Sequence, residues 1–218
     1  MKKAIPLHQI YSQYKIMPNL QLHQLRVAAV GQMIAESIPG FDETKEVVTT
    51  CLLHDMGNII KFNLNYFPEF LEPEGLAYWQ KVKDEYIEKY GIDEHHATQS
   101  IIAELVQSEN IKAYANQVGF TKLEETEGDQ SLAKKICAYS DMRVGPHGVI
   151  SVEERLAEGR KRYAGRTDKA IATDRYDVLA NTLREVERQV FAKSTIRPEY
   201  ISDEAVNKKL EELRNFEI

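Results

Sequence analysis

The chain is poor in cysteine, with only Cys51 and Cys137 among its 218 residues. So few cysteines exclude the disulfide framework that stabilises many small secreted domains. Both lie in apolar segments with helical spacing, so we expect reduced, buried side chains. Residues 1–6 lack the apolar core of a signal peptide. We therefore expect a cytoplasmic protein.

Long apolar runs and an excess of positive charge are also lacking. No run approaches the roughly 18 apolar residues of a membrane-spanning helix, so we expect no membrane contact. The 34 acidic residues outnumber the 28 basic ones and give a net charge of −6. A protein that binds duplex nucleic acid through its phosphates carries a basic surface. We therefore expect no binding of duplex nucleic acid, whereas a local basic pocket for a phosphorylated small molecule remains open.

The alternating apolar and polar pattern that is typical of strands is missing as well. Apolar residues instead recur at helical spacing, which predicts an all-α protein. Asp93, Asp129 and the pair Ser151 and Glu154 have the chemistry of helix caps, and an acidic loop is expected over 124–128. Helices are expected over about 20–38, 43–55, 74–90, 94–107, 130–144, 169–192 and 202–215, with another beginning after Ser151.

Two polar residues, His54 and Asp55, end one of these apolar helices. A buried carboxylate costs several kcal/mol unless it is paired or bound to a metal. Imidazole nitrogen and carboxylate oxygen are good ligands for Zn, Fe, Mn or Ni. A hydrogen-bonded His–Asp pair is the alternative for this dipeptide alone. Gly57 is expected to give the backbone conformational freedom just after the pair.

Three further helices place ligand-type side chains on their apolar faces. His23 is in helical register with Val27, and Asp141 follows Cys137 by four residues. His95 falls about 70° from the centre of the apolar face of its helix, and His96 falls nearly opposite. We therefore expect His95 to point inward and His96 to be solvated. Each residue alone fits an ordinary core, but several converging segments predict a metal site inside a helical bundle.

The order His23, His54–Asp55, Asp141 resembles the HD-domain superfamily of metal-dependent phosphohydrolases. The resemblance covers about residues 20–165 and includes the segments 139–144 and 162–163. It implies a mainly helical fold with a divalent metal (Mn, Fe, Ni, Co, Zn or Mg) held by residues that match His23, His54, Asp55 and Asp141.

Members of the superfamily with two metals add histidines between the His-Asp pair and the final Asp. This chain offers His95, with His96 as its substitute, which favours one metal or an incomplete second site. Many members continue the motif as His-Asp-x-Gly-Lys, but Asn58 occupies the last position here. Lys61 is the candidate to replace that lysine.

The resemblance also sets the expected organisation and activity. We expect a lead-in over 1–19, an HD-like bundle over 20–165, and C-terminal helices over 166–218 packed on or beside it. The expected reaction is hydrolysis of a phosphate ester or anhydride in a small metabolite or nucleotide by metal-activated water. A di-iron oxygenase and a non-catalytic binding module are the alternatives, and a homodimer is possible.

Specific roles follow for the candidate residues. Asp55 would bind the metal and orient the water, while His95 or Glu94 would carry protons. Three cationic side chains are candidates for binding the substrate phosphate, namely Lys61, Arg26 and Arg143.

Overall fold

The computed structural model describes residues 4–164 and 171–218, without the side chains of 162–164. The described residues form helices and no strand, and two isolated bridges join Pro6 to Glu217 and Val144 to Val149. The prediction of an all-α fold is confirmed. None of the described helices has the length and apolar composition needed to cross a membrane. The helices are α1 (Leu7–Gln13), α2 (Pro18–Glu36), α3 (Thr44–Leu53), η1 (Asn58–Lys61), η2 (Pro68–Leu71), α4 (Leu76–Tyr90), α5 (Glu94–Leu105), α6 (Glu109–Asn116), η3 (Phe120–Lys122), α7 (Leu123–Gly128), α8 (Leu132–Met142), α9 (Val152–Ala164), α10 (Thr173–Phe191), η4 (Pro198–Tyr200), α11 (Asp203–Asn207) and α12 (Leu210–Arg214).

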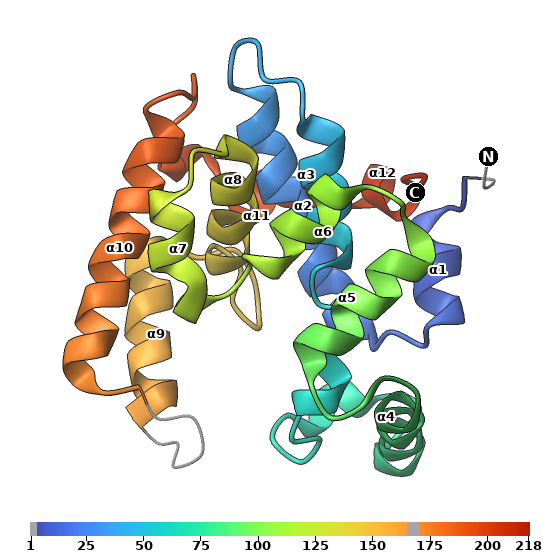
Figure 1. Cartoon of the computed structure of the whole chain (residues 1–218). Helices are drawn as coiled ribbons and strands as arrows, with labels where there is room; N and C mark the ends of the chain where they lie inside the picture. The colour runs from blue at the N-terminus through green and yellow to red at the C-terminus, as the bar shows by residue number, and fades with distance from the viewer. Residues whose placement is uncertain (1–3, 165–170) are drawn as a thin grey trace.

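Helices α2 and α3 occupy the centre of the molecule, with α7 to α10 on one side and α1, α4 and α5 on the other (Figure 1). Helices α2, α3 and α8 pack on one another at Gly31. A Cβ on Gly31 would lie 3.1 Å from Val47, 3.2 Å from the Cys51 sulfur and 3.3 Å from the Ser140 hydroxyl. The absent side chain therefore lets the three central helices approach each other.

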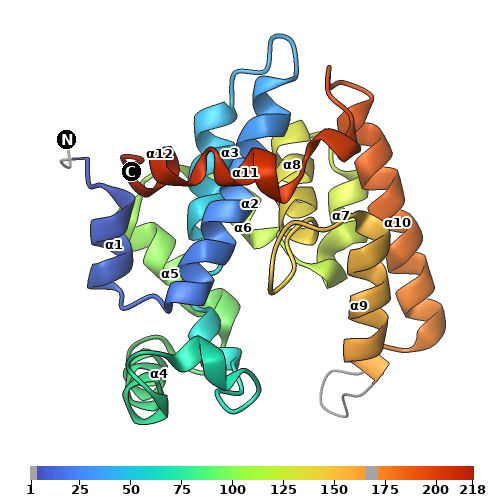
Figure 2. The same ribbon diagram turned by 180° about the vertical axis from the view of Figure 1, so that it is seen from behind.

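The two ends of the chain lie side by side. Ile5 and Ile218 exchange two backbone hydrogen bonds of 3.0 and 3.1 Å. Helices α11 and α12 cross the face of α2 on the far side of the molecule (Figure 2). A single hydrophobic core includes Leu7 near the start and Leu213 near the end. The boundary expected at 165–166, and the expected start of a helix at 169, lie outside the described residues.

Two of the predicted helix caps are confirmed. The Asp93 carboxylate accepts the N–H of His96 at 2.7 Å. Ser151 and Glu154 form a reciprocal capping box, with bonds of 2.8 and 3.2 Å to each other's backbone N–H. These bonds satisfy N–H groups that a first helical turn leaves without partners.

Three predictions about helix starts and ends are wrong. Ser131, not Asp129, caps α8, while Asp129 accepts the Ser131 N–H at 2.8 Å and pairs with Lys134 at 2.6 Å. The segment expected as an acidic loop over 124–128 is the helix α7, whose buried Leu123 anchors it against α8 and α10. The last expected helix is divided into α11 and α12.

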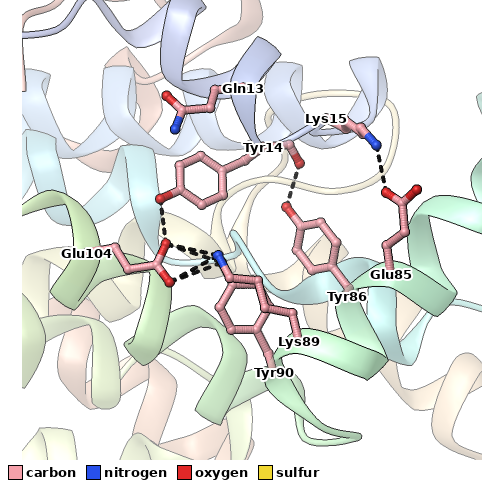
Figure 3. A pocket seen from close by; sticks show the side chains of 8 residues that line it. All are labelled: Gln13, Tyr14, Lys15, Glu85, Tyr86, Lys89, Tyr90 and Glu104. Carbon is pink, nitrogen blue, oxygen red and sulfur yellow. Dashed lines mark hydrogen bonds and ion pairs between the residues drawn. The ribbon is translucent and has the colours of Figure 1, made fainter.

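A hollow between α1, α4 and α5 is lined by polar side chains that pair with one another (Figure 3). Tyr14 donates to Glu104 at 2.8 Å, and Tyr86 donates to the Tyr14 carbonyl at 2.5 Å. Lys15 pairs with Glu85 at 2.6 Å. These bonds fasten the lead-in helix α1 to α4 and α5, so we assign the hollow a structural role.

Candidate metal centre

The His54–Asp55 pair occupies the turn that follows the last residue of α3. His54 Nδ1 lies 2.8 Å from the Cys51 carbonyl, so this ring nitrogen donates a hydrogen bond. The backbone N–H of Asp55 donates to Gln24 Oε1 at 3.3 Å. A donor at Nδ1 leaves the lone pair of His54 on Nε2, which is the arrangement that metal-binding histidines have.

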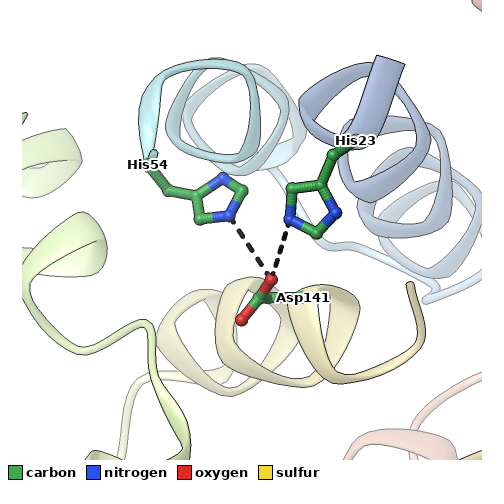
Figure 4. Close-up of side chains that lie close together, drawn as sticks. All are labelled: His23, His54 and Asp141. Atoms are coloured by element: carbon green, nitrogen blue, oxygen red, sulfur yellow. Dashed lines mark hydrogen bonds and ion pairs between the residues drawn. The ribbon is translucent and has the colours of Figure 1, made fainter. Parts of the chain in front are cut away.

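Two imidazoles and two carboxylates converge from α2, α8 and the end of α3. His23 Nε2 lies 3.1 Å from Asp141 Oδ1, and His54 Nε2 lies 3.5 Å from the same oxygen (Figure 4). Both Nε2 atoms lie 3.6 Å from Asp55 Oδ2. One ligand atom from each of His23, His54 and Asp141 falls within 4.8 Å of the others, which is close enough to hold one ion.

The geometry of His54 fits a bound metal. Its side chain is only 1% exposed, and Nε2 makes no hydrogen bond to any described residue. A buried ring nitrogen without a partner costs folding free energy. A metal ion would satisfy it, and two imidazoles with two carboxylates are a donor set that suits divalent transition metals. The four residues that the resemblance implied therefore lie close together, and His23, His54 and Asp141 could hold an ion.

The same contacts set the protonation of the metal-free site. Burial alone would lower the pKa of His54, but the carboxylates of Asp55 and Asp141 raise it to about 9. Burial alone would raise the pKa of Asp141, but the hydrogen bond from His23 and the charges of the His23 and His54 imidazoles hold that pKa well below its usual range. Without a metal, the site therefore holds a proton on an imidazole between two carboxylates.

The structure does not bring His95 into this cluster. His95 and His96 are both exposed, so the prediction that His95 points inward is wrong. Both lie in the first turn of α5, whose buried face begins only at Ala97. The inward residue of that turn is Glu94, whose side chain is 14% exposed and lies 3.9 Å from the Lys61 ammonium.

Helix α5 is fastened directly to the turn that follows the His-Asp pair. The buried N–H of Gly57 donates to Thr98 Oγ1 at 2.9 Å. Gly57 has a φ of −93°, which any residue can adopt. The expectation that Gly57 supplies conformational freedom is therefore wrong. Residue 57 must instead be small, because α5 packs directly against it.

Arg143 does not serve as a phosphate ligand, contrary to the sequence-based expectation. It is 4% exposed and donates to the carbonyls of Ile150 at 2.6 Å, Ile201 at 3.1 Å and Pro198 at 3.3 Å. It also donates to the Tyr139 hydroxyl at 2.7 Å. These bonds tie the end of α8 to the C-terminal segment and use four of the five N–H donors of the guanidinium.

The other two cationic candidates keep donors for a ligand. Arg26 is one turn beyond His23 on α2, and its buried Nε has no partner among the described residues. Lys61 is exposed at the end of η1 beside Glu94.

Two supporting residues were missed by the sequence analysis. Tyr11 of α1 donates its hydroxyl to the Leu52 carbonyl at 2.7 Å, just before the His-Asp pair. Gln24 precedes Val27 by three residues, so its place on the buried face of α2 could have been recognised. No local signal in the sequence indicates the contact of Tyr11.

Two histidines and two aspartates that converge within an all-helical fold define a helical protein with a site able to hold a metal ion. The chain also matches the HD domain family model over residues 21–182, which is more than half of its length. The chain therefore belongs to the HD-domain family, whose members are mostly metal-dependent phosphohydrolases. No curated protein and no solved structure matches the chain.

Proposed function

We propose that this protein hydrolyses a phosphate ester or anhydride in a small phosphorylated metabolite or nucleotide. The observation that carries the proposal is the buried His54 Nε2, which makes no hydrogen bond to a described residue and lies 3.6 Å from Asp55 Oδ2 and 3.5 Å from Asp141 Oδ1. A divalent metal at this point supplies a Lewis acid that activates water and polarises a phosphoryl oxygen. His23, His54, Asp55 and Asp141 would hold it.

The proton movements of hydrolysis need two further groups. Water forms a bond to phosphorus, the bond to the leaving oxygen breaks, and that oxygen takes up a proton. Asp55 Oδ2 lies 3.6 Å from both imidazoles and is suited to orient the water and accept its proton. Glu94, half-buried on α5, is our first candidate for the acid that protonates the leaving group. The exposed His95 is the second.

Binding of the substrate phosphate is assigned to Arg26 and Lys61, the two candidate cations that remain after Arg143. Arg26 follows His23 by one helical turn, and a guanidinium matches the geometry of a phosphate group. Lys61 lies beside Glu94 and would act as a point charge. In the family motif a lysine occupies the position of Asn58 and faces the phosphate. Lys61 would take over that role here.

The test is phosphate release from a panel of phosphorylated metabolites and nucleotides by protein loaded in turn with Mn²⁺, Fe²⁺, Ni²⁺, Co²⁺, Zn²⁺ or Mg²⁺. We expect turnover of at least one substrate that chelation abolishes. Glu94→Gln should lower kcat more than His95→Ala does. Metal binding without turnover would instead support a binding module, and strict dependence on O₂ would support an oxygenase.

A further inference from the structure

Gln24 connects two of the metal-binding residues. It follows His23 directly on α2, and its side chain accepts the backbone N–H of Asp55 at 3.3 Å. The residue is fully buried, at 0% exposure. The Gln24 side chain therefore connects α2, which carries His23, to the backbone of Asp55.

The amide group of Gln24 is not explained by the stability of the fold. Its Nε2 is buried and donates to no acceptor in the described part of the chain. A buried donor without a partner lowers stability, and an apolar side chain of similar volume would avoid that cost. The hydrogen bond that the amide oxygen accepts from the Asp55 N–H therefore indicates the role of Gln24 better than its effect on stability does.

Thr50 offers a matched comparison on the neighbouring helix. It lies on α3, which packs against α2, and it is also fully buried. Its hydroxyl likewise has no hydrogen-bond partner among residues 4–164 and 171–218. Unlike Gln24, it makes no described hydrogen bond to a metal-binding residue.

We propose that Gln24 is a positioning residue of the metal centre, because its amide holds the Asp55 peptide and with it the direction of the Asp55 carboxylate. Gln24 itself binds neither metal nor substrate. The inference rests on the proposed metal site. Loss of a group that orients a metal ligand typically reduces affinity about 10–100-fold.

The experiment compares Gln24→Met with Thr50→Val by direct titration of metal-free protein with Mn²⁺, and by the absorption spectrum of the Co²⁺-loaded protein. Gln24→Met should weaken Mn²⁺ binding at least about 10-fold and change the Co²⁺ spectrum. Its metal-free melting temperature should stay close to that of wild type, because the change removes the unpartnered Nε2 donor and also the acceptor of the Asp55 N–H, and these two effects oppose each other. Thr50→Val should retain the wild-type affinity and spectrum.

Two results would overturn the inference while leaving the metal site in place. One is wild-type Mn²⁺ affinity in Gln24→Met. The other is an equal loss of affinity in both variants together with lower metal-free melting temperatures, which would mean a general packing role. If wild-type protein binds no Mn²⁺ or Co²⁺, the proposed function fails first and the inference fails with it.

Discussion

Gly57 lies so close to Glu94 that a Cβ on Gly57 would be 2.5 Å from the Glu94 carbonyl oxygen. The same Cβ would be 2.8 Å from the backbone nitrogen of Thr98. Backbone atoms of a helix cannot move aside as the end of a flexible side chain can. Because Gly57 follows Asp55 by two residues, the first turn of α5 packs directly against the turn that carries His54 and Asp55.

Gly57→Ala should therefore destabilise the protein and weaken its metal binding. Overpacking of this kind costs about 1–3 kcal/mol, and displacement of α5 would also shift the His54–Asp55 turn. Urea unfolding with and without metal measures both effects. Gly128→Ala is the matched control, because a Cβ there meets nothing within 4 Å. Equal stability of the two variants would contradict the close packing of α5.

The metal-free site should show a characteristic pH dependence. Since its carboxylate neighbours raise the pKa of His54 from 6.5 to about 9, His54 stabilises the metal-free fold fully below about pH 6.5. That contribution is lost as the pH rises through about 9. Metal binding must remove the same proton, so the metal-induced rise in melting temperature should grow over this range.

The measurement is thermal melting with and without Mn²⁺ at about pH 6.5 and about pH 8.5. In Asp141→Asn, which lacks one of the charges that raise the pKa of His54, the metal-free pH dependence should be weaker. A metal-induced shift of equal size at both pH values would contradict this assignment of the proton.

Arg143 and Arg26 should respond to substitution in opposite ways. Arg143→Met removes hydrogen bonds to three carbonyls and a hydroxyl, which should cost about 3 kcal/mol of stability. It should leave KM unchanged. Arg26→Met should raise KM with little loss of stability, because its Nε makes no hydrogen bond within the described chain. Urea unfolding and steady-state kinetics separate the two, and a raised KM in Arg143→Met would reverse the assignment.

The fold class and the convergence of His23, His54, Asp55 and Asp141 could be predicted from the sequence because both depend on local patterns. Helical spacing of apolar residues gave α2, α4 and α5 to within a few residues. The register of His23 with Val27, and of Asp141 with Cys137, placed each ligand on the face that packs inward.

The errors arose where position depends on packing between distant segments. The prediction that His95 points inward rests on the apolar face of its own helix. Whether a residue in the first turn of a helix is buried depends instead on which neighbouring elements extend far enough to cover it. Arg143 was expected at a phosphate because its carbonyl partners, at Ile150, Pro198 and Ile201, are not evident from the sequence. The space that Gly57 provides depends likewise on α5.

Asp55 offers the most direct test of the central claim, which is that the His-Asp pair holds a metal needed for catalysis. Melting temperature and phosphate release should be measured with and without Mn²⁺ in wild type, Asp55→Ala and Asp42→Ala, an exposed carboxylate that serves as the charge control. Wild type and Asp42→Ala should gain stability and activity on refilling, by mass action on the folded state. Asp55→Ala should lose both responses. Retention of a wild-type metal-dependent shift and near-normal turnover by Asp55→Ala would contradict the account.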